Sequence, residues 1–397
     1  MILSIVVPAY NEEQAIEDTI QDLLKAEKII FLQCPEIKLV EVWIVDDGSQ
    51  DKTAEIVKRH QEVHLISYKK NLGYGAALKN GFDHASGDLL AFMDADRTLD
   101  ASAFATLCRT LLDRSADIVV GNRLHINSQM PIVRKLGNIL FAAMVRLLAG
   151  VQVGDVASGM RVFRREIFPH LVPLPNNLSF TPAMSTRATM ENLYMVEERV
   201  PYLSRVGKSK LSIIKDGYIF STIILQIAFS YQPAKFFVYF GCVLLLVSLG
   251  YLLPTLAHYF YLRSIPDYYI YRLLTILVCG VVGVHLCLLG LFAQQMVDNQ
   301  NNNKPRRWYN LLYDWMGERF LFNTGFFLML TGFGLNFKGI LHYLKTLTVE
   351  EHWSYPLAGA GFMLLGSNLI SFGVVRKVIT LFQERLGASR KITKDHQ

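Results

Sequence analysis

The chain has 397 residues, of which 51% are hydrophobic and 19% charged, and its mean hydropathy is +0.26. That length suits two or three domains, and the positive mean hydropathy is high for a purely soluble protein. The net charge of +6 suits anionic lipid headgroups or phosphorylated substrates, but it is too small to indicate nucleic-acid binding. None of the five cysteines forms a C-x-x-C pair, so the sequence predicts neither a zinc site nor a disulfide framework.

The first half of the chain alternates short apolar runs with stretches of helical spacing. The expected strands are Leu3–Ala9, Val40–Val45, Val63–Ser67, Leu89–Met93 and Ile118–Val120, and the expected helices include Glu12–Ala26 and Thr53–His60. This alternation predicts an α/β, Rossmann-like domain with a mostly parallel sheet, in which ligands bind beyond the carboxyl ends of the strands. The first apolar run is short and lacks a basic segment before it, so we expect this domain to stay in the cytoplasm.

The sequence predicts two amphipathic helices that lie in the interfacial region of a membrane. Arg134–Gly150 places leucines and an isoleucine at helical spacing beside basic residues, and Ser212–Tyr231 gathers its polar residues on one stripe. An ordinary helix that faces a protein core is the alternative for both segments.

The second half of the chain contains four long, nearly charge-free runs. They are Phe236–Leu256, Leu273–Ala293, Phe320–Phe337 and Tyr355–Val375. Each is close to the roughly 20 residues that a helix needs to cross a bilayer. Basic residues cluster before the first run, between the second and third, and after the fourth, at Lys208, Lys210, Lys215, Lys235, Lys304, Arg306, Arg307, Arg319, Arg376, Lys377, Arg385, Arg390, Lys391 and Lys394. The positive-inside rule therefore predicts four transmembrane helices with both termini and the first domain in the cytoplasm.

The segment Asp94-Ala95-Asp96 follows the expected strand Leu89–Met93 directly. Two carboxylates at positions i and i+2, at the carboxyl end of a strand, can share a divalent cation such as Mg²⁺ or Mn²⁺. That cation would neutralise a diphosphate leaving group. A solvated acidic turn is the alternative interpretation of this short pattern.

Other strand ends also carry polar or aromatic residues. Asp46-Asp47-Gly48-Ser49 can accept hydrogen bonds from a base or a ribose, and Tyr10 within Pro8-Ala9-Tyr10-Asn11-Glu12 can stack on a base. Asn71-Leu72-Gly73-Tyr74-Gly75 opens a further helix, and its glycines permit close approach of the backbone. It lacks the Gly-Lys-Ser/Thr sequence of a P-loop, so no ATPase is predicted.

Together these segments resemble the GT-A glycosyltransferases of family 2. Three further motifs resemble the dolichol-phosphate mannosyltransferase group of polyprenyl-phosphate glycosyltransferases: Gly121-Asn122-Arg123, Ser158-Gly159-Met160-Arg161-Val162-Phe163 and Arg205-Val206-Gly207-Lys208-Ser209-Lys210. The resemblance covers roughly the first 230 residues. On this basis the expected domains are a GT-A domain at 1–211, which includes an interfacial helix near 134–150, an interfacial helix at 212–232, four transmembrane helices at 233–382 and a cytoplasmic tail at 383–397.

The resemblance implies roles for individual residues. Pro8, Tyr10, Glu12 and Asp47 would hold the nucleoside, Asp94 and Asp96 the metal and the diphosphate beside the backbone of Ala95, Arg123 and Arg134 the acceptor phosphate, and Arg205 and Lys210 the donor diphosphate or the acceptor. Family members often carry a glutamine two residues after the second aspartate, where this chain has Thr98. The segment Asn176–Arg187 also departs from the mannosyltransferase pattern, which leaves the sugar open.

The reaction that the resemblance implies is inverting transfer of one sugar from a nucleotide-sugar to dolichyl or undecaprenyl phosphate, giving a lipid-linked monosaccharide. The Q-x-x-R-W motif of processive synthases is missing, because Lys304 stands where the glutamine is required. Asp155 is a candidate base or positioning group, and with Asp96 and Arg123 it completes the expected catalytic set. Diacylglycerol or ceramide are alternative acceptors.

A different class of function is a membrane scaffold or transport component that carries a degenerate transferase domain. His285, the titratable side chain within the second apolar run, is the residue that favours it. Gly359, Gly361 and Gly366 permit close helix packing within or between chains, so a homo-oligomer is also left open.

Overall fold

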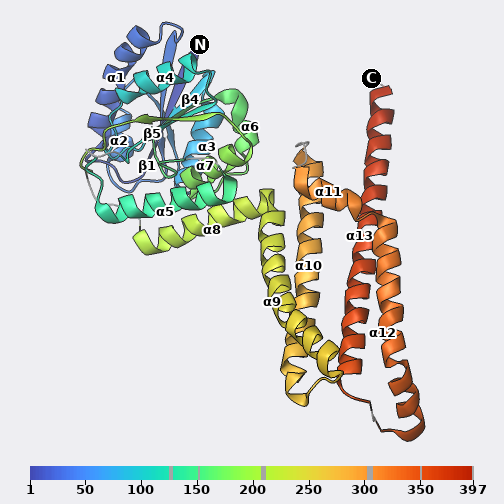
Figure 1. The fold of residues 1–397 in the computed structure, drawn as a ribbon. Helices are drawn as coiled ribbons and strands as arrows, with labels where there is room; N and C mark the ends of the chain where they lie inside the picture. The colour runs from blue at the N-terminus through green and yellow to red at the C-terminus, as the bar shows by residue number, and fades with distance from the viewer. Residues whose placement is uncertain (125–127, 151–152, 207–211, 302–306, 349–350, 396–397) are drawn as a thin grey trace. The chain divides into compact units, whose positions relative to one another are not determined.

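The computed structural model describes the chain except for residues 125–127, 151–152, 207–211, 302–306, 349–350 and 396–397 (Figure 1). The strands are β1 (Ile2–Ala9), β2 (Leu39–Asp46), β3 (His64–Ser67), β4 (Leu89–Phe92), β5 (Ile118–Asn122), β6 (Arg161–Arg164) and β7 (Met195–Arg199). The α-helices are α1 (Ile16–Gln33), α2 (Thr53–Val57), α3 (Tyr74–His84), α4 (Ala103–Asp113), α5 (Ile132–Ala149), α6 (Phe168–Leu171), α7 (Phe180–Met190), α8 (Ile213–Tyr231), α9 (Pro233–Leu262), α10 (Ile270–Asn301), α11 (Arg307–Trp315), α12 (Glu318–Thr346) and α13 (Ser354–Asp395). The chain divides into two compact units, 1–228 and 229–397.

The first unit is built on a seven-stranded sheet with the order β3-β2-β1-β4-β6-β5-β7. Strand β1 runs parallel to β2 and β4, β2 to β3, and β5 to β7, whereas β6 runs antiparallel to β4 and β5. The predicted α/β fold with a mostly parallel sheet is therefore confirmed. Strands β6 and β7 were not predicted, because RVFR and MVEER are too rich in charge to give an apolar signal, and their pairing depends on tertiary contacts.

The sheet brings several carboxyl strand ends to one edge of the domain. Strands β1 and β4 are almost wholly buried, as expected of strands covered by helices on both faces. The parallel register sets Ala9 of β1 opposite Asp46 of β2, and Val6 of β1 opposite Phe92 of β4. Tyr10 and Asp47 follow the last residues of β1 and β2 directly, and Asp94 follows β4 after one intervening residue, so these three residues emerge at the same edge.

Helices α5 and α8 pack against each other within the first unit. Phe141 and Phe220 meet edge to face at 5.6 Å, inside a cluster that also holds Val145 and Ile224. Their other faces are apolar but exposed, at Ile132, Leu136, Leu140 and Leu147 of α5 and at Ile214, Tyr218 and Leu225 of α8. Both segments predicted to be amphipathic are therefore helices with one packed and one exposed apolar side.

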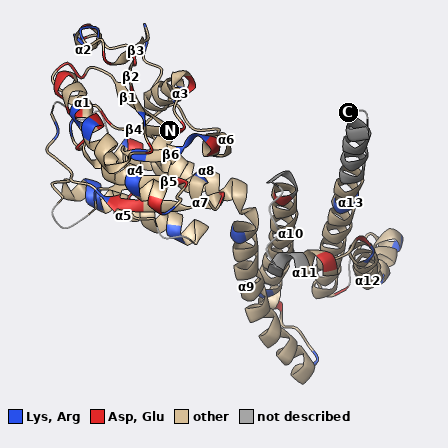
Figure 2. Cartoon of the chain, turned by 90° about the horizontal axis from the view of Figure 1, so that it is seen from above, with Lys and Arg blue, Asp and Glu red and all other residues tan. Residues whose placement is uncertain are grey.

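The second unit contains two helical hairpins, α9 with α10 and α12 with α13, and the short helix α11 between them in the sequence. These helices and α8 are the five that are long and apolar enough to cross a membrane among the described residues. The chain is thus an integral membrane protein, and the four predicted spans lie in α9, α10, α12 and α13. Figure 2 shows that these helices carry few charged residues along their length. Helix α13 extends past the predicted end of the fourth span to Asp395.

Glycines set the spacing of the α12–α13 hairpin. The backbones of Gly325 and Gly366, and those of Gly332 and Gly359, approach so closely that a Cβ at any of the four would overlap the facing backbone or side chain. Gly359 and Gly366 thus pack within the chain. Small residues at such contacts allow the van der Waals packing that holds membrane helices together.

Replacing Gly332 by leucine is expected to lower the apparent Tm of the detergent-solubilised protein, because overpacking of a tight contact costs about 1–3 kcal/mol. Gly334→Leu on the same helix is the matched control, since a Cβ there meets open space. Thermal unfolding of both variants makes the comparison. Equal Tm values for the two would show that the contact does not contribute to stability.

Candidate active site

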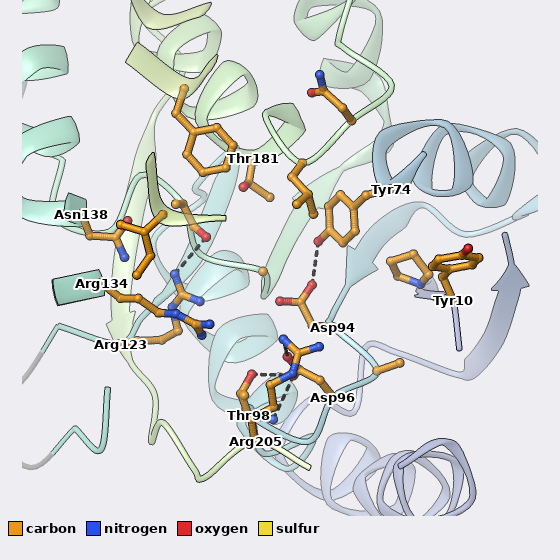
Figure 3. Close-up of a pocket in the computed structure, with 18 of the residues that line it drawn as sticks. Tyr10, Tyr74, Asp94, Asp96, Thr98, Arg123, Arg134, Asn138, Thr181 and Arg205 are labelled. Carbon is orange, nitrogen blue, oxygen red and sulfur yellow. Dashed lines mark hydrogen bonds and ion pairs between the residues drawn. The ribbon is translucent and has the colours of Figure 1, made fainter. Parts of the chain in front are cut away.

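A cavity of about 450 Å³ opens at the carboxyl edge of the sheet, within the first unit. Helices α3, α5, α7 and α8 and the segment after β7 complete its walls, and Figure 3 shows some of the lining side chains. It brings together the predicted site residues Pro8, Tyr10, Glu12, Asp47, Asp94, Ala95, Asp96, Arg123, Arg134 and Arg205. Residues that are scattered along the sequence therefore share one site. Lys210 lies outside the described residues.

The end of the cavity near Tyr10 is fixed by backbone hydrogen bonds to Asp47. The Asp47 carboxylate accepts from the N–H groups of Leu72 and Gly73, at 2.7 and 2.8 Å. These bonds tie the loop after β2 to the segment that opens α3. Burial raises the pKa of Asp47 despite the two hydrogen bonds.

Asp96 is held by a different set of partners. The Thr98 hydroxyl donates to Asp96 Oδ1 at 2.7 Å, and Arg205 Nη1 approaches Asp96 Oδ2 at 2.8 Å. Arg205 Nη2 also lies 3.4 Å from Glu12 Oε1. Thr98, which replaces the family glutamine, thus orients the second aspartate of the motif, and a guanidinium neutralises it.

Asp94 faces the cavity between Tyr74 and Gly159. The Tyr74 hydroxyl donates to Asp94 Oδ1 at 2.8 Å, and a Cβ at position 159 would overlap the Asp94 carboxylate. Only glycine fits beside that carboxylate, which explains the glycine of the Ser158-Gly159 motif. Burial and the neighbouring charge of Asp96 raise the pKa of Asp94 to about 7.

The residues around Asp96 fit a divalent cation. The described residues contain no group of three or more His, Cys, Asp or Glu side chains that could hold a metal by themselves. Asp94 and Asp96 could supply two oxygen ligands, and Mg²⁺ is commonly held by one or two carboxylates plus substrate phosphates and water. The Arg205 guanidinium on Asp96 shows that this carboxylate accepts a cation.

Arg123 forms a buried ion pair with Asp155. Its Nε and Nη2 atoms donate to the Asp155 carboxylate at 2.7 and 3.0 Å, and its backbone N–H donates at 3.1 Å. Burial opposes the charged guanidinium, but Asp155 keeps the pKa of Arg123 above its usual value. Asp155 is 0% exposed and does not line the cavity. The prediction that it is a base is therefore at odds with its position, whereas a positioning role fits it.

Tyr202, which the sequence did not single out, lies beside Arg123 and Arg134. Arg134 Nη1 is 3.4 Å from the Tyr202 hydroxyl, and the Arg123 guanidinium lies 6.0 Å from the centre of the ring. Thr181 at the start of α7 and Asn138 on α5 also line the cavity without having been predicted. No local motif marks these residues, because tertiary packing brings them to the site.

The first part of the chain is similar in sequence to known proteins. Residues 4–172 match the family model described as glycosyl transferase family 2. The chain is 31% identical over 245 residues to the dolichyl-phosphate beta-glucosyltransferase of Trichomonas vaginalis, covering 57% of this chain and 71% of the relative. It is 29% identical over 220 residues to the low-salt glycan biosynthesis hexosyltransferase of Haloferax volcanii, and it spans about half (51%) of that relative's length.

A solved structure with a similar fold is glucosyl-3-phosphoglycerate synthase from Mycobacterium tuberculosis, in complex with Mn²⁺, UDP and glucosyl-3-phosphoglycerate. The identity is 19%, the TM-score is 0.47, and the match covers 57% of this chain and 80% of that one. The predicted resemblance is confirmed by the family model and by the relative of which the chain covers 71%. The chain belongs to glycosyl transferase family 2.

Proposed function

We propose that the protein transfers one sugar from a nucleotide-sugar to a polyprenyl phosphate at the cytoplasmic face of a membrane. The observation that carries this proposal is one cavity that holds the Asp94–Asp96 pair, Arg205, Arg123 and Arg134. Such a site can accept a diphosphate and a second phosphate, because cationic side chains and carboxylate-bound metal offset their negative charge. The relative named as a dolichyl-phosphate glucosyltransferase supports the same acceptor class.

The chemistry requires one bond to form and one to break. An oxygen of the acceptor phosphate attacks the anomeric carbon, the bond from that carbon to the donor diphosphate breaks, and the configuration inverts. The acceptor phosphate is already ionised at neutral pH, so a strong base is not needed. Arg123 and Arg134 orient the acceptor, and Arg205 meets the leaving diphosphate.

Asp94 and Asp96 would hold Mg²⁺ or Mn²⁺. When bound, the cation supplies positive charge to the diphosphate leaving group. Arg205 contacts Asp96 and lines the same cavity, so its guanidinium would offset the charge of the phosphates beside the metal. Asp155 would act through Arg123, because its buried carboxylate fixes the guanidinium that faces the acceptor.

The exposed apolar faces of α5 and α8 support contact with a bilayer. On α5 the exposed residues Ile132, Leu136 and Leu140 are spaced four apart, so they lie on one stripe. Both helices contribute to the cavity wall, through Val133, Asn138 and Phe220 among others. A polyprenyl chain could therefore remain in lipid while its phosphate enters the site. The basic residues that flank the apolar runs favour a cytoplasmic location for this side.

The test of this function is a donor screen with the purified full chain in detergent. The protein would receive dolichyl or undecaprenyl phosphate, Mg²⁺ or Mn²⁺, and one labelled nucleotide-sugar at a time. Labelled lipid from one donor, formed only with metal, is the expected result. No labelled lipid from any donor, with nucleotide binding intact, would contradict the proposal.

Nucleotide binding is expected to weaken as the pH falls. The ionised form of Asp94 attracts a cation, and its pKa of about 7 means that this form is lost on going below neutrality. Between about pH 8 and about pH 6 the ionised fraction falls roughly tenfold, so the Kd of Mn²⁺–nucleoside diphosphate should rise by about that factor. Titration calorimetry at both pH values measures it. Asp94→Asn is the control for titration of the nucleotide itself, and an identical pH dependence in this variant would contradict the assignment.

A further inference from the structure

Arg97 follows the Asp94-Ala95-Asp96 segment directly and has no role in the mechanism above. Its backbone φ is +58°, in the left-handed region that residues with a Cβ seldom adopt. Asp96 and Thr98 on either side of it line the cavity, whereas Arg97 does not. In Figure 3 the side chains of Asp96 and Thr98 lie next to each other beside Arg205. The chain thus makes a left-handed turn at the one residue between two that face the site.

The side chain of Arg97 is attached to helix α1 by two ion pairs. Its Nη1 atom lies 2.5 Å from Asp18 Oδ2, and its Nη2 atom lies 3.2 Å from Asp22 Oδ2. Asp18 and Asp22 are four residues apart, so they lie on one face of the helix. The Arg97 side chain is 36% exposed, so these pairs are partly shielded from water. Helix α1 therefore restrains the residue whose backbone is left-handed.

The backbone just before Arg97 is fixed from two directions. The Thr19 hydroxyl on α1 is buried and donates to the Ala95 carbonyl at 3.1 Å. The Val206 N–H, in the segment after β7, donates to the Asp96 carbonyl at 3.2 Å. With these carbonyls held, the direction in which the chain continues depends on the φ and ψ angles of Arg97.

The orientation of the Asp96 carboxylate depends on that direction. The N–H and the hydroxyl of Thr98 both donate to Asp96 Oδ1, at 3.1 and 2.7 Å. A rotation of Arg97 to the usual negative φ would move Thr98 relative to Asp96 and break both hydrogen bonds. The left-handed conformation of Arg97 is therefore a condition for the position that Asp96 has in the cavity.

We propose that Arg97 is a positioning residue, whose ion pairs with Asp18 and Asp22 hold the left-handed turn that directs Asp96 toward a metal ion. The proposal rests on the function proposed above. A left-handed residue with a Cβ is unfavourable in isolation and persists where its surroundings impose it. Glycine adopts the same conformation without a steric penalty. The proposal therefore predicts that glycine can replace Arg97, although it forms no ion pair.

The first test measures the affinity of the full chain for Mn²⁺ with UDP, or with GDP if UDP does not bind, by titration calorimetry. Arg97→Gly should stay within about twofold of wild type, because glycine keeps the left-handed turn. Arg97→Val should bind at least about tenfold more weakly, because a β-branched residue disfavours that turn. Without Mn²⁺ the two variants should bind the diphosphate alike, since the lost affinity belongs to the metal.

The second test removes the two carboxylates of α1 in each background. Asp18→Ala combined with Asp22→Ala should weaken binding of Mn²⁺ and diphosphate by about three- to fivefold in the wild-type chain. The same two substitutions should have no effect in Arg97→Gly, because glycine needs no ion pair to stay left-handed. Glu17→Ala is the matched control, since Glu17 lies on the same helix and pairs with His60 instead.

The outcomes separate this proposal from the proposed function. Equal losses in Arg97→Gly and Arg97→Val would show that the guanidinium matters rather than the backbone, and would overturn the proposal. Full affinity in Arg97→Val, a loss that is as large without Mn²⁺, or an equal effect of the α1 carboxylates in both backgrounds would overturn it too. Each of these results leaves the transferase in place. Wild-type protein that binds Mn²⁺ with neither diphosphate would overturn the proposed function as well.

Discussion

Asp96→Ala is expected to lower kcat/KM for sugar transfer by about a thousandfold, because metal and preorganised charge supply most of the stabilisation of a departing diphosphate. The variant loses the carboxylate that Thr98 orients and Arg205 neutralises. It should still fold, since Asp96 lies at the cavity surface rather than within the apolar core. Initial rates with a labelled donor measure the effect.

Asp100→Ala is the matched control for this variant. Asp100 belongs to the same loop, but it accepts a hydrogen bond from the Ser102 N–H and does not line the cavity. Its activity should stay within about twofold of wild type, as for surface changes away from a site. Activity of Asp96→Ala within tenfold of the Asp100→Ala value would rule out a central role for Asp96.

Arg123→Ala is expected to cost about 3–5 kcal/mol in the free energy of unfolding of the first unit, because it leaves a buried carboxylate without its cation. Asp155 is fully buried and takes three hydrogen bonds from Arg123. Denaturant unfolding followed by tryptophan fluorescence measures the loss. Arg123→Met combined with Asp155→Leu should recover most of the stability, since an apolar pair of similar volume often replaces a buried ion pair.

A substitution of Asp155 distinguishes two possible roles of this residue. A positioning role predicts that Asp155→Asn raises the KM for the acceptor and leaves the shape of the kcat pH profile unchanged, because the asparagine can still accept a hydrogen bond from Arg123. A general base predicts a fall in kcat and the loss of one limb of that profile. The second outcome would show that Asp155 acts as a base on the reacting atoms, although its side chain is buried.

Much of the fold could be predicted because burial and periodicity dominate those segments. Strands β1 and β4 are apolar over nearly every position, and the membrane helices combine length with absence of charge. Strand β6 was missed because its ends are arginines, and the sequence cannot show that Arg161 is buried with backbone carbonyls as its partners. In that case tertiary context overrides local composition.

The candidate site was predicted as a set of residues but not as a set of contacts. Motifs indicated that Asp94, Asp96 and Arg205 belong together, whereas the attachment of Arg205 to Asp96 and of Tyr74 to Asp94 depends on side-chain geometry. The same holds for Asp155, because its position in the sequence, just before the Ser158-Gly159 motif, does not show whether its side chain faces a cavity. Thr181 has no motif of its own, and its place in the cavity wall depends on packing around Arg161, which donates a hydrogen bond to its carbonyl.

Transfer to a phosphate acceptor is the central claim, and a matched pair of lipids tests it most directly. Purified protein with its donor and Mn²⁺ would receive either undecaprenyl phosphate or undecaprenol, which share one chain and differ in the phosphate. Label should enter the lipid extract with undecaprenyl phosphate alone, because Arg123 and Arg134 require an anionic acceptor. Equal or greater transfer to undecaprenol, or to diacylglycerol or ceramide, would contradict it.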